Sequence, residues 1–209
     1  MPTEVVKAGR GALEKAASVV RAGGLIIYPT DTVYGLGCDP LNARAVGRVF
    51  EVKGRGARPL PVLASSVEEA MRVAELSEIA LELAQAFWPG PLTLVVPRKP
   101  ILPSVLTCDL PSVGVRVPGH EFAIELIRAC GGLLVGTSAN KSGHPPPRTV
   151  EEALRELGGS VELAIDGGPT PLGISSTVLD LTGPEPRLVR EGPIKMEDIL
   201  EALRTVRKG

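Results

Sequence analysis

The chain contains very few aromatic residues. Only 3% of its 209 residues are aromatic, with three Phe, two Tyr and one Trp, although 44% of the residues are hydrophobic. A buried core must therefore be built mainly from Ala, Val, Leu and Ile. Proteins that recognise RNA commonly stack bases on aromatic side chains, so this composition disfavours base stacking as the main activity.

Cysteine is also scarce, and Cys38, Cys108 and Cys130 lie far apart in the chain. Their number is odd, and none belongs to a Cys-x-x-Cys pair or to the Cys/His spacing of a zinc site. The pattern excludes a disulfide framework. It fits reduced thiols that are packed as small apolar side chains in a cytoplasmic protein.

The chain has neither a long apolar run nor an excess of one charge. No run approaches the roughly 18 residues that cross a bilayer, and the amino terminus lacks the apolar segment of a signal peptide. The 23 basic residues are balanced by 24 acidic ones, which removes net charge as an argument for a nucleic-acid or membrane partner. We expect a soluble, cytoplasmic protein that forms a single domain over residues 1–209.

Hydrophobic periodicity predicts helices that alternate with short strands. The expected helices cover residues 11–22, 43–53, 66–76, 77–87, 121–130, 149–157 and 196–206. The expected strands cover residues 24–28, 59–64, 92–96, 112–117, 133–135, 161–165, 176–181 and 187–190. This alternation, without a break in composition, predicts an α/β domain around a mixed sheet.

An unusually polar stretch follows the first of these apolar strands. Residues 29–37 read Pro-Thr-Asp-Thr-Val-Tyr-Gly-Leu-Gly, and we expect them to form a loop. The hydroxyls of Thr30, Thr32 and Tyr34 and the carboxylate of Asp31 are more polar groups than a connecting turn needs. We interpret the stretch as one wall of a small-molecule site, with a polar turn at a strand end as the alternative.

Positive charges occur at two further places. Lys53, Arg55 and Arg58 lie within six residues without an acidic residue between them, and such a loop can surround a polyanion. A solvated basic loop is the alternative. Arg116 lies in a valine-rich strand, and His120 begins the next expected helix, whose amino terminus attracts anions. A structural ion pair and a helix cap are the alternatives for these two residues.

Hydroxyl and amide groups gather at the ends of other strands. Ser138, Asn140 and Ser142 follow a buried strand, whereas Ser176 opens a later strand and Arg190 closes one. Such groups hold a substrate by hydrogen bonds, although polar turns use the same residues. The fingerprints of a P-loop, a dinucleotide-binding fold and a serine hydrolase are incomplete. The sequence therefore points to a substrate site without a covalent intermediate.

Several pieces of the chain occur in the order found in one known family. They are residues 29–37, Lys53-Gly54-Arg55, Pro59-Leu60, residues 113–118, Ser138-Ala139-Asn140 with Ser142-Gly143, and Ser176-Thr177-Val178 with Asp180. Together they resemble the YrdC-like family, the threonylcarbamoyl-AMP synthases, over about residues 10–205. The resemblance implies an open, twisted sheet of parallel and antiparallel strands that is flanked by helices and carries a large basic cavity.

The resemblance also implies a reaction. Threonine, bicarbonate and ATP would give threonylcarbamoyl-AMP and pyrophosphate, and a transferase complex would pass the threonylcarbamoyl group to tRNA. Lys53 and Arg55 would be catalytic, and the residues that face threonine would be Thr30, Thr32, His120 and Asn140. The residues that face ATP would be Lys53, Arg55, Arg58, Arg116, Ser138, Ser142, Ser176 and Arg190. Mg²⁺ would accompany ATP without a dedicated carboxylate cage.

The chain departs from the family pattern in two respects. The loop after Lys53-Gly54-Arg55 lacks the usual Pro and is shorter, and we expect the short form of the family without an extra carboxy-terminal domain. An RNA-binding module and a nucleotide-binding paralogue without synthase activity are the alternative functions. The presence of Lys53, Arg116 and Asn140 favours an active enzyme over the paralogue.

Overall fold

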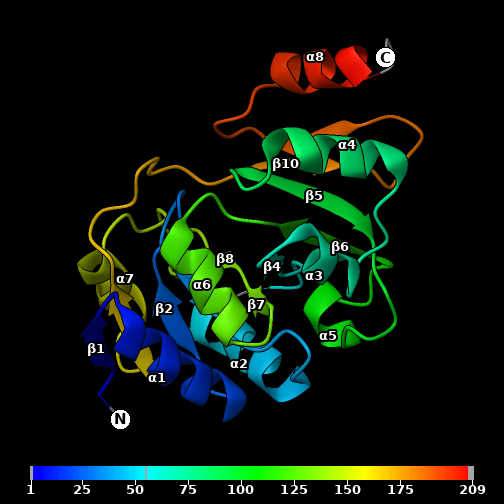
Figure 1. The fold of residues 1–209 in the computed structure, drawn as a ribbon. Helices are drawn as coiled ribbons and strands as arrows, with labels where there is room; N and C mark the ends of the chain where they lie inside the picture. The colour runs from blue at the N-terminus through cyan, green and yellow to red at the C-terminus, as the bar shows by residue number, and fades with distance from the viewer. Residues whose placement is uncertain (1, 55, 207–209) are drawn as a thin grey trace.

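The computed structural model describes residues 2–54 and 56–206 (Figure 1). The described helices are α1 (Arg10–Arg21), α2 (Ala43–Lys53), α3 (Val67–Met71), α4 (Glu78–Phe87), α5 (Ser104–Thr107), α6 (Glu121–Ala129), α7 (Val150–Leu157) and α8 (Met196–Val206). The described strands are β1 (Glu4–Lys7), β2 (Ile26–Tyr28), β3 (Gly35–Gly37), β4 (Val62–Ala64), β5 (Leu92–Pro97), β6 (Ser112–Arg116), β7 (Leu133–Val135), β8 (Thr137–Ser138), β9 (Leu163–Asp166), β10 (Thr177–Asp180) and β11 (Arg187–Arg190).

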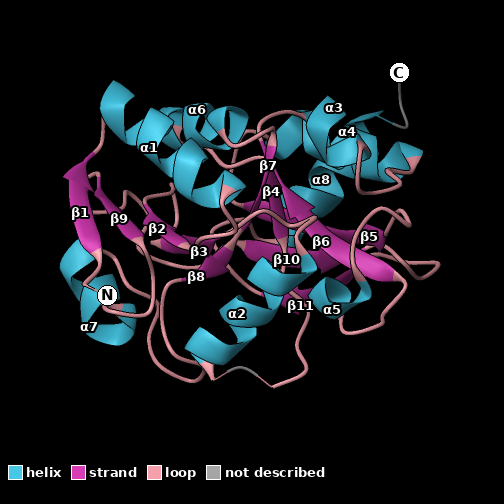
Figure 2. Ribbon diagram, turned by 90° about the horizontal axis from the view of Figure 1, so that it is seen from below, coloured by secondary structure: helices cyan, strands magenta, loops and turns pink. Residues whose placement is uncertain are grey.

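The strands are divided between two sheets. One sheet has five strands in the order β1-β9-β2-β3-β8, and the other has six strands in the order β11-β10-β5-β6-β4-β7. Each sheet contains parallel and antiparallel pairs, for example β2 parallel to β9 and antiparallel to β3. Figure 2 shows the strands as a central band with α1, α3 and α6 on one side and α2 and α5 on the other. The predicted α/β class with mixed strand directions is confirmed, although the sequence indicated one sheet.

The end of the polar stretch is a strand, which corrects the expectation that residues 29–37 form a loop. Gly35–Gly37 forms β3 and pairs antiparallel with β2. A Cβ atom would lie 2.9 Å from the Tyr28 ring at Gly35 and 2.7 Å from it at Gly37. The glycines are therefore needed for the close packing of β3 on Tyr28, even though glycine is unfavourable in strands by propensity.

Other differences from the expected elements also have local causes. β1, β8 and the short α5 were not expected, and β4 begins only at Val62, because Pro59 and Pro61 carry no N–H for the ladder. Helix α3 ends at Met71, before the expected residue 76, because the next residues pair with the end of β5: the Glu75 N–H donates to the carbonyl of Pro97. The side chains of Ser66 and Thr149 accept from the backbone N–H groups of Glu69 and Glu152 and so cap α3 and α7.

The core is aliphatic, as the composition predicts. Its larger cluster joins residues of β2 to β6 with the inner faces of α2 and α4, and a smaller cluster lies beneath α1 and α6. Tyr28 and Tyr34 are the largest fully buried side chains. Within residues 2–54 and 56–206, no helix is long and apolar enough to cross a bilayer.

Candidate active site

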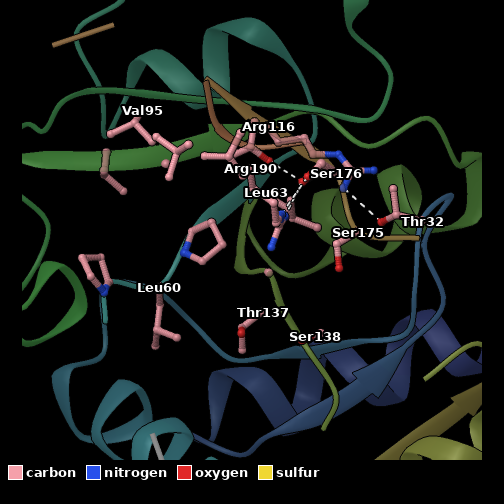
Figure 3. A pocket seen from close by; sticks show the side chains of 18 of the residues that line it. Thr32, Leu60, Leu63, Val95, Arg116, Thr137, Ser138, Ser175, Ser176 and Arg190 are labelled. Carbon is pink, nitrogen blue, oxygen red and sulfur yellow. Dashed lines mark hydrogen bonds between the residues drawn. The ribbon is translucent and has the colours of Figure 1, made fainter. Parts of the chain in front are cut away.

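A cavity of about 360 Å³ lies over one face of the six-stranded sheet (Figure 3). The register places Val95 beside Gly114 and Thr93 beside Val178, so these side-chain positions share one face of the sheet. A Cβ atom at Gly114 would lie 3.2 Å from Thr93 Cγ2 and 3.4 Å from Pro61 Cβ. The glycine therefore leaves the middle of the cavity floor open.

The walls of the cavity come from both sheets. The lining residues outside the floor are Thr32, Val33, Pro59, Leu60, Pro61, Leu63, Leu110, Ser112, Val113, Gly136, Thr137, Ser138, Ser175, Ser176, Val189, Arg190 and the side chain of Arg116. Apolar lining side chains come mainly from residues 59–63, with Leu110 and Val113, whereas the guanidinium groups come from β6 and β11 and the hydroxyls from several segments. The cavity can therefore receive a ligand with one flat apolar part and one charged part.

Arg116 is a buried cation held by three acceptors. Its Nε donates to the carbonyl of Gly90 at 2.8 Å, its Nη1 donates to Thr32 Oγ1 at 3.1 Å, and its Nη2 donates to Asp31 Oδ1. Burial lowers the pKa of Arg116, and the neighbouring carboxylate of Asp31 opposes that shift. Arg116 therefore forms a structural ion pair, the alternative given above, and its partner is Asp31. The side chains of Arg116 and Asp31 are only 5% and 6% exposed.

The two threonines of the polar stretch contact each other. Thr30 Oγ1 lies 3.0 Å from Thr32 Oγ1 and donates to the carbonyl of Val33 at 2.7 Å. It also accepts from the backbone N–H of Thr32 at 3.1 Å. Thr30 thus stabilises the turn of this stretch through its hydrogen bonds. Thr32 and Val33 line the cavity.

Lys53 lies beneath the segment that follows β8. Its amine donates to the carbonyl of Ser138 and, at 2.7 Å, to the carbonyl of Asn140. The backbone N–H of Ser142 donates to the carbonyl of Lys53 at 2.9 Å. The end of α2 and residues 138–142 are therefore joined, and the left-handed Gly54 (φ 55°) that follows α2 lets the chain turn away from the helix there.

Asn140 is buried, and the two polar atoms of its side-chain amide have different surroundings. Its Nδ2 donates to the carbonyls of Lys141 and His144 at 2.9 and 2.8 Å. Its Oδ1 is a buried atom for which the described part of the chain supplies no hydrogen-bond donor. Asn140 thus closes the loop between residues 140 and 144 and keeps one acceptor available.

His120 caps the amino terminus of α6. Its Nδ1 accepts from the backbone N–H of Ala123 at 3.2 Å, so the capping nitrogen is unprotonated and the neutral ring carries its proton on Nε2. Burial lowers the pKa of His120, although Asp31 opposes that shift. The helix cap given above as the alternative for His120 is therefore present, and the ring can also act as a hydrogen-bond donor through Nε2.

Ser176 and Arg190 both line the cavity and contact each other (Figure 3). Arg190 Nε donates to the carbonyl of Ser176 at 3.0 Å, and its Nη2 donates to Ser176 Oγ at 3.1 Å. Ser176 Oγ also lies 2.8 Å from Thr93 Oγ1 on the cavity floor. Arg190 is exposed and Ser176 is buried, so a buried hydroxyl orients a surface cation.

The structure brings many of the predicted site residues to one place. Those that line the cavity are Thr32, Arg116, Ser138, Ser176 and Arg190. Thr30, Lys53 and Asn140 do not line the cavity but bond to the lining residues Thr32 or Ser138. Ser142 bonds to Lys53, and His120 caps α6; neither is a lining residue. Arg58 is exposed and directly precedes the lining residues Pro59 and Leu60, and Arg55 lies outside the described residues.

Sequence reasoning missed the apolar part of the cavity and the full role of Asp31. The alternation around Arg116 already places Ser112, Gly114 and Arg116 on one face of β6, which is a signal for a floor. The contribution of Val95 and Val178 follows only from strand pairing. Asp31 was visible as a carboxylate in a polar stretch, but its pairing with Arg116 depends on contact between residues that are 85 positions apart.

A family model for Sua5, YciO and YrdC proteins, described as "telomere recombination", matches residues 18–192. The chain belongs to the Sua5/YciO/YrdC family. It is 43% identical over 194 residues to a threonylcarbamoyl-AMP synthase of Pyrococcus abyssi, a match that covers 92% of this chain and 57% of the relative. It is 44% identical over 191 residues to a putative threonylcarbamoyl-AMP synthase of Mycobacterium tuberculosis, with 90% of this chain and 87% of the relative covered.

A solved structure of this family has the same fold. The P. abyssi Sua5 protein complexed with L-threonine superposes with a TM-score of 0.91 at 41% identity, which covers 97% of this chain and 60% of that protein. The chain thus spans less than two thirds of the P. abyssi protein and most of the M. tuberculosis relative. The predicted family is confirmed, and its relatives carry the name of an enzyme.

Proposed function

We propose that this chain is a threonylcarbamoyl-AMP synthase, a nucleotidyltransferase that uses L-threonine, bicarbonate and ATP. The observation that carries the proposal is the cavity, which joins an apolar floor with Arg116 and Arg190 and with the hydroxyls of Thr32 and Ser176. The names of relatives at 43% and 44% identity support the same reaction. An RNA-binding or inactive paralogue receives no comparable support.

The proposed reaction needs positioning more than a nucleophilic side chain. The amine of threonine captures bicarbonate as a carbamate and water is released, then a carbamate oxygen attacks the α-phosphate of ATP and pyrophosphate leaves. Negative charge gathers on the phosphates during this step, so fixed cations and hydrogen-bond donors stabilise the transition state. Arg116, held by three acceptors, is such a fixed cation.

We assign the remaining residues by the family resemblance and by their place around the cavity. Thr30, Thr32, His120 and Asn140 face threonine in this proposal, and Ser138, Ser142, Ser176 and Arg190 face ATP. Lys53, Arg55 and Arg58 neutralise the triphosphate. The amine of Lys53 supports this role through its place beside Ser138 and Asn140, where its charge lies next to a lining segment.

We propose that Mg²⁺ enters with ATP and shields the charge of the phosphates. Among residues 2–54 and 56–206, no group of three or more His, Cys, Asp or Glu side chains could hold a metal ion. In this proposal the ion is held chiefly by phosphate oxygens and water. We further propose a cytoplasmic location, a tRNA threonylcarbamoyl-transferase complex as the consumer of the product, and one domain over residues 1–209, which the lining of the cavity by both sheets supports.

Release of pyrophosphate tests the proposed function. We expect release from ATP only when L-threonine and bicarbonate are both present, and none when either is omitted. Nucleotide binding without turnover would favour the inactive paralogue. The absence of both nucleotide binding and turnover would contradict the proposal and bring RNA binding forward.

A further inference from the structure

Asp31 has one carboxylate oxygen that the protein leaves without a donor. Its Oδ1 accepts from Arg116 Nη2, whereas its Oδ2 is a buried atom that receives no hydrogen bond from the described residues. A buried acceptor without a donor lowers the stability of a protein, and more so when it is charged. Such an atom beside a cavity calls for a ligand that supplies the missing donor.

The unpaired Oδ2 of Asp31 lies close to residues that line the cavity. Thr32 follows Asp31 in the chain and Arg116 is paired with it, and both line the cavity. On its other side, Oδ2 would lie 3.3 Å from a Cβ atom at Gly119, and the same Cβ would lie 3.2 Å from Cα of Gly90. A side chain at position 119 would therefore crowd Oδ2, and glycine leaves this side of the carboxylate to backbone atoms.

The charges around Asp31 favour a ligand with both signs. A guanidinium has five N–H bonds, and the described residues accept three of them from Arg116, which leaves two for an anionic group. Asp31 Oδ2 is an acceptor only and suits a cationic donor. His120 adds no competing positive charge at neutral pH, because burial lowers its pKa from the ordinary histidine value, which is itself below neutrality. The buried pair is thus complementary to a zwitterion.

We propose that Asp31 recognises the α-ammonium group of the amino-acid substrate through Oδ2, while Oδ1 holds Arg116. This inference rests on the proposed function, because it takes an amino acid as the ligand. An ammonium group brings three donors and no acceptor, which matches the unpaired Oδ2. A 2-hydroxy acid of the same shape offers a single weaker donor, so Asp31 makes the site specific for the amine that becomes carbamoylated.

Binding by titration calorimetry separates this role from a purely structural one. The ligands are L-threonine and 2,3-dihydroxybutanoate, in which a hydroxyl replaces the ammonium group. Wild-type protein should bind L-threonine at least about tenfold more tightly, as expected for a hydrogen bond between charged groups. Asp31→Asn keeps an acceptor for Arg116 and removes the charge. It should weaken threonine binding by about 10- to 100-fold and change binding of the hydroxy acid by less than about threefold.

Thr32→Val is the matched control, because it removes another acceptor of Arg116 without changing the charge at Asp31. It should affect both ligands equally. Equal weakening of both ligands by Asp31→Asn would show that Asp31 acts only through Arg116 and would overturn the inference. Should that variant not fold, equal affinity of wild-type protein for the two ligands would overturn it as well. Wild-type protein that binds neither ligand would instead overturn the proposed function.

Discussion

Arg116 and Arg190 line the same cavity but lie in different surroundings. Arg116 is on β6, with strands on both sides, and is 4% exposed, with Asp31 as an ion-pair partner. Arg190 ends β11, the edge strand of the same sheet, and donates hydrogen bonds to two oxygen atoms of Ser176. One cation is part of the interior, and the other is placed at the surface.

The difference shows that one site combines a buried, ion-paired guanidinium with an exposed one. A buried guanidinium must be paired, because an uncompensated charge in the interior is strongly destabilising, and pairing fixes its position before a ligand arrives. An exposed arginine stays in contact with water, so its charge costs little without a ligand, and Ser176 orients the guanidinium of Arg190 towards the cavity rim. We therefore expect substitutions at Arg116 to affect stability and activity together, and substitutions at Arg190 to affect mainly binding.

Arg116→Ala should have the largest effect. It leaves the carboxylate of Asp31 buried without its cation, so the free energy of unfolding should fall by about 3–5 kcal/mol. Urea denaturation measures this change. Replacement of both partners, Arg116→Met with Asp31→Leu, should restore most of the loss because no uncompensated charge remains. A loss below about 1 kcal/mol in Arg116→Ala would mean that the two arginines do not differ as described.

Lys53→Met should reduce threonine-dependent pyrophosphate release by at least about 100-fold, the order seen when one preorganised donor or charge is removed from an active site. Methionine keeps an unbranched apolar stem in the buried position, so the fold should survive, as thermal unfolding can check. Lys15→Met is the control, because Lys15 lies on α1 with a partly exposed side chain. Turnover within about threefold of wild type would remove Lys53 from the site.

Arg190→Ala should raise the KM for ATP about tenfold, as expected for the loss of a charge-assisted hydrogen bond, and should change the free energy of unfolding by less than about 1 kcal/mol. Arg187→Ala is the control on the same strand: it is exposed, pairs with Asp180 and lies outside the cavity. Steady-state kinetics with varied ATP tests both variants. Equal KM values for the two would contradict a binding role for Arg190.

The pH dependence of the His120 cap should be the smallest effect. Since burial lowers the pKa of His120 in the folded state, the unfolded state binds more protons between the two pKa values. Stability should therefore decrease as the pH falls from the ordinary histidine value towards the lowered one. Protonation removes the acceptor for the Ala123 N–H, a contribution of up to about 1 kcal/mol for a helix cap.

His120→Asn isolates this contribution, because asparagine caps helices without titrating. Urea denaturation between about pH 5 and pH 7 should give a steeper loss for wild type than for the variant. Parallel curves for the two proteins would show that the cap does not titrate in this range.

The sequence predicts the cavity floor better than its walls. Alternation of Val113 and Val115 with Gly114 and Arg116 identifies the strand, and a buried charge requires a partner. The walls depend on contacts between distant segments, such as the amine of Lys53 on the carbonyls after β8. The residue types at these places also occur in ordinary polar turns, so the family resemblance supplied most of that prediction.

The missed strands have the same explanation. β3 contains two glycines and β8 only Thr137 and Ser138, so neither has the apolar alternation that marks a strand. Each exists because it pairs with its neighbour: Gly35 lies opposite Ser138 and Leu36 opposite Thr137. Tertiary pairing thus overrides local propensity at the place where the five-stranded sheet reaches the cavity.

Identification of the product tests the proposed synthesis of threonylcarbamoyl-AMP most directly. The purified chain would be incubated with ATP, ¹³C-bicarbonate and ¹⁵N-labelled L-threonine, and the adenylate fraction would be analysed by mass spectrometry. We expect an adenylate that carries both labels and disappears when either labelled substrate is omitted. An adenylate without the ¹³C label, or AMP alone, would contradict the assignment of this cavity to threonylcarbamoyl-AMP synthesis.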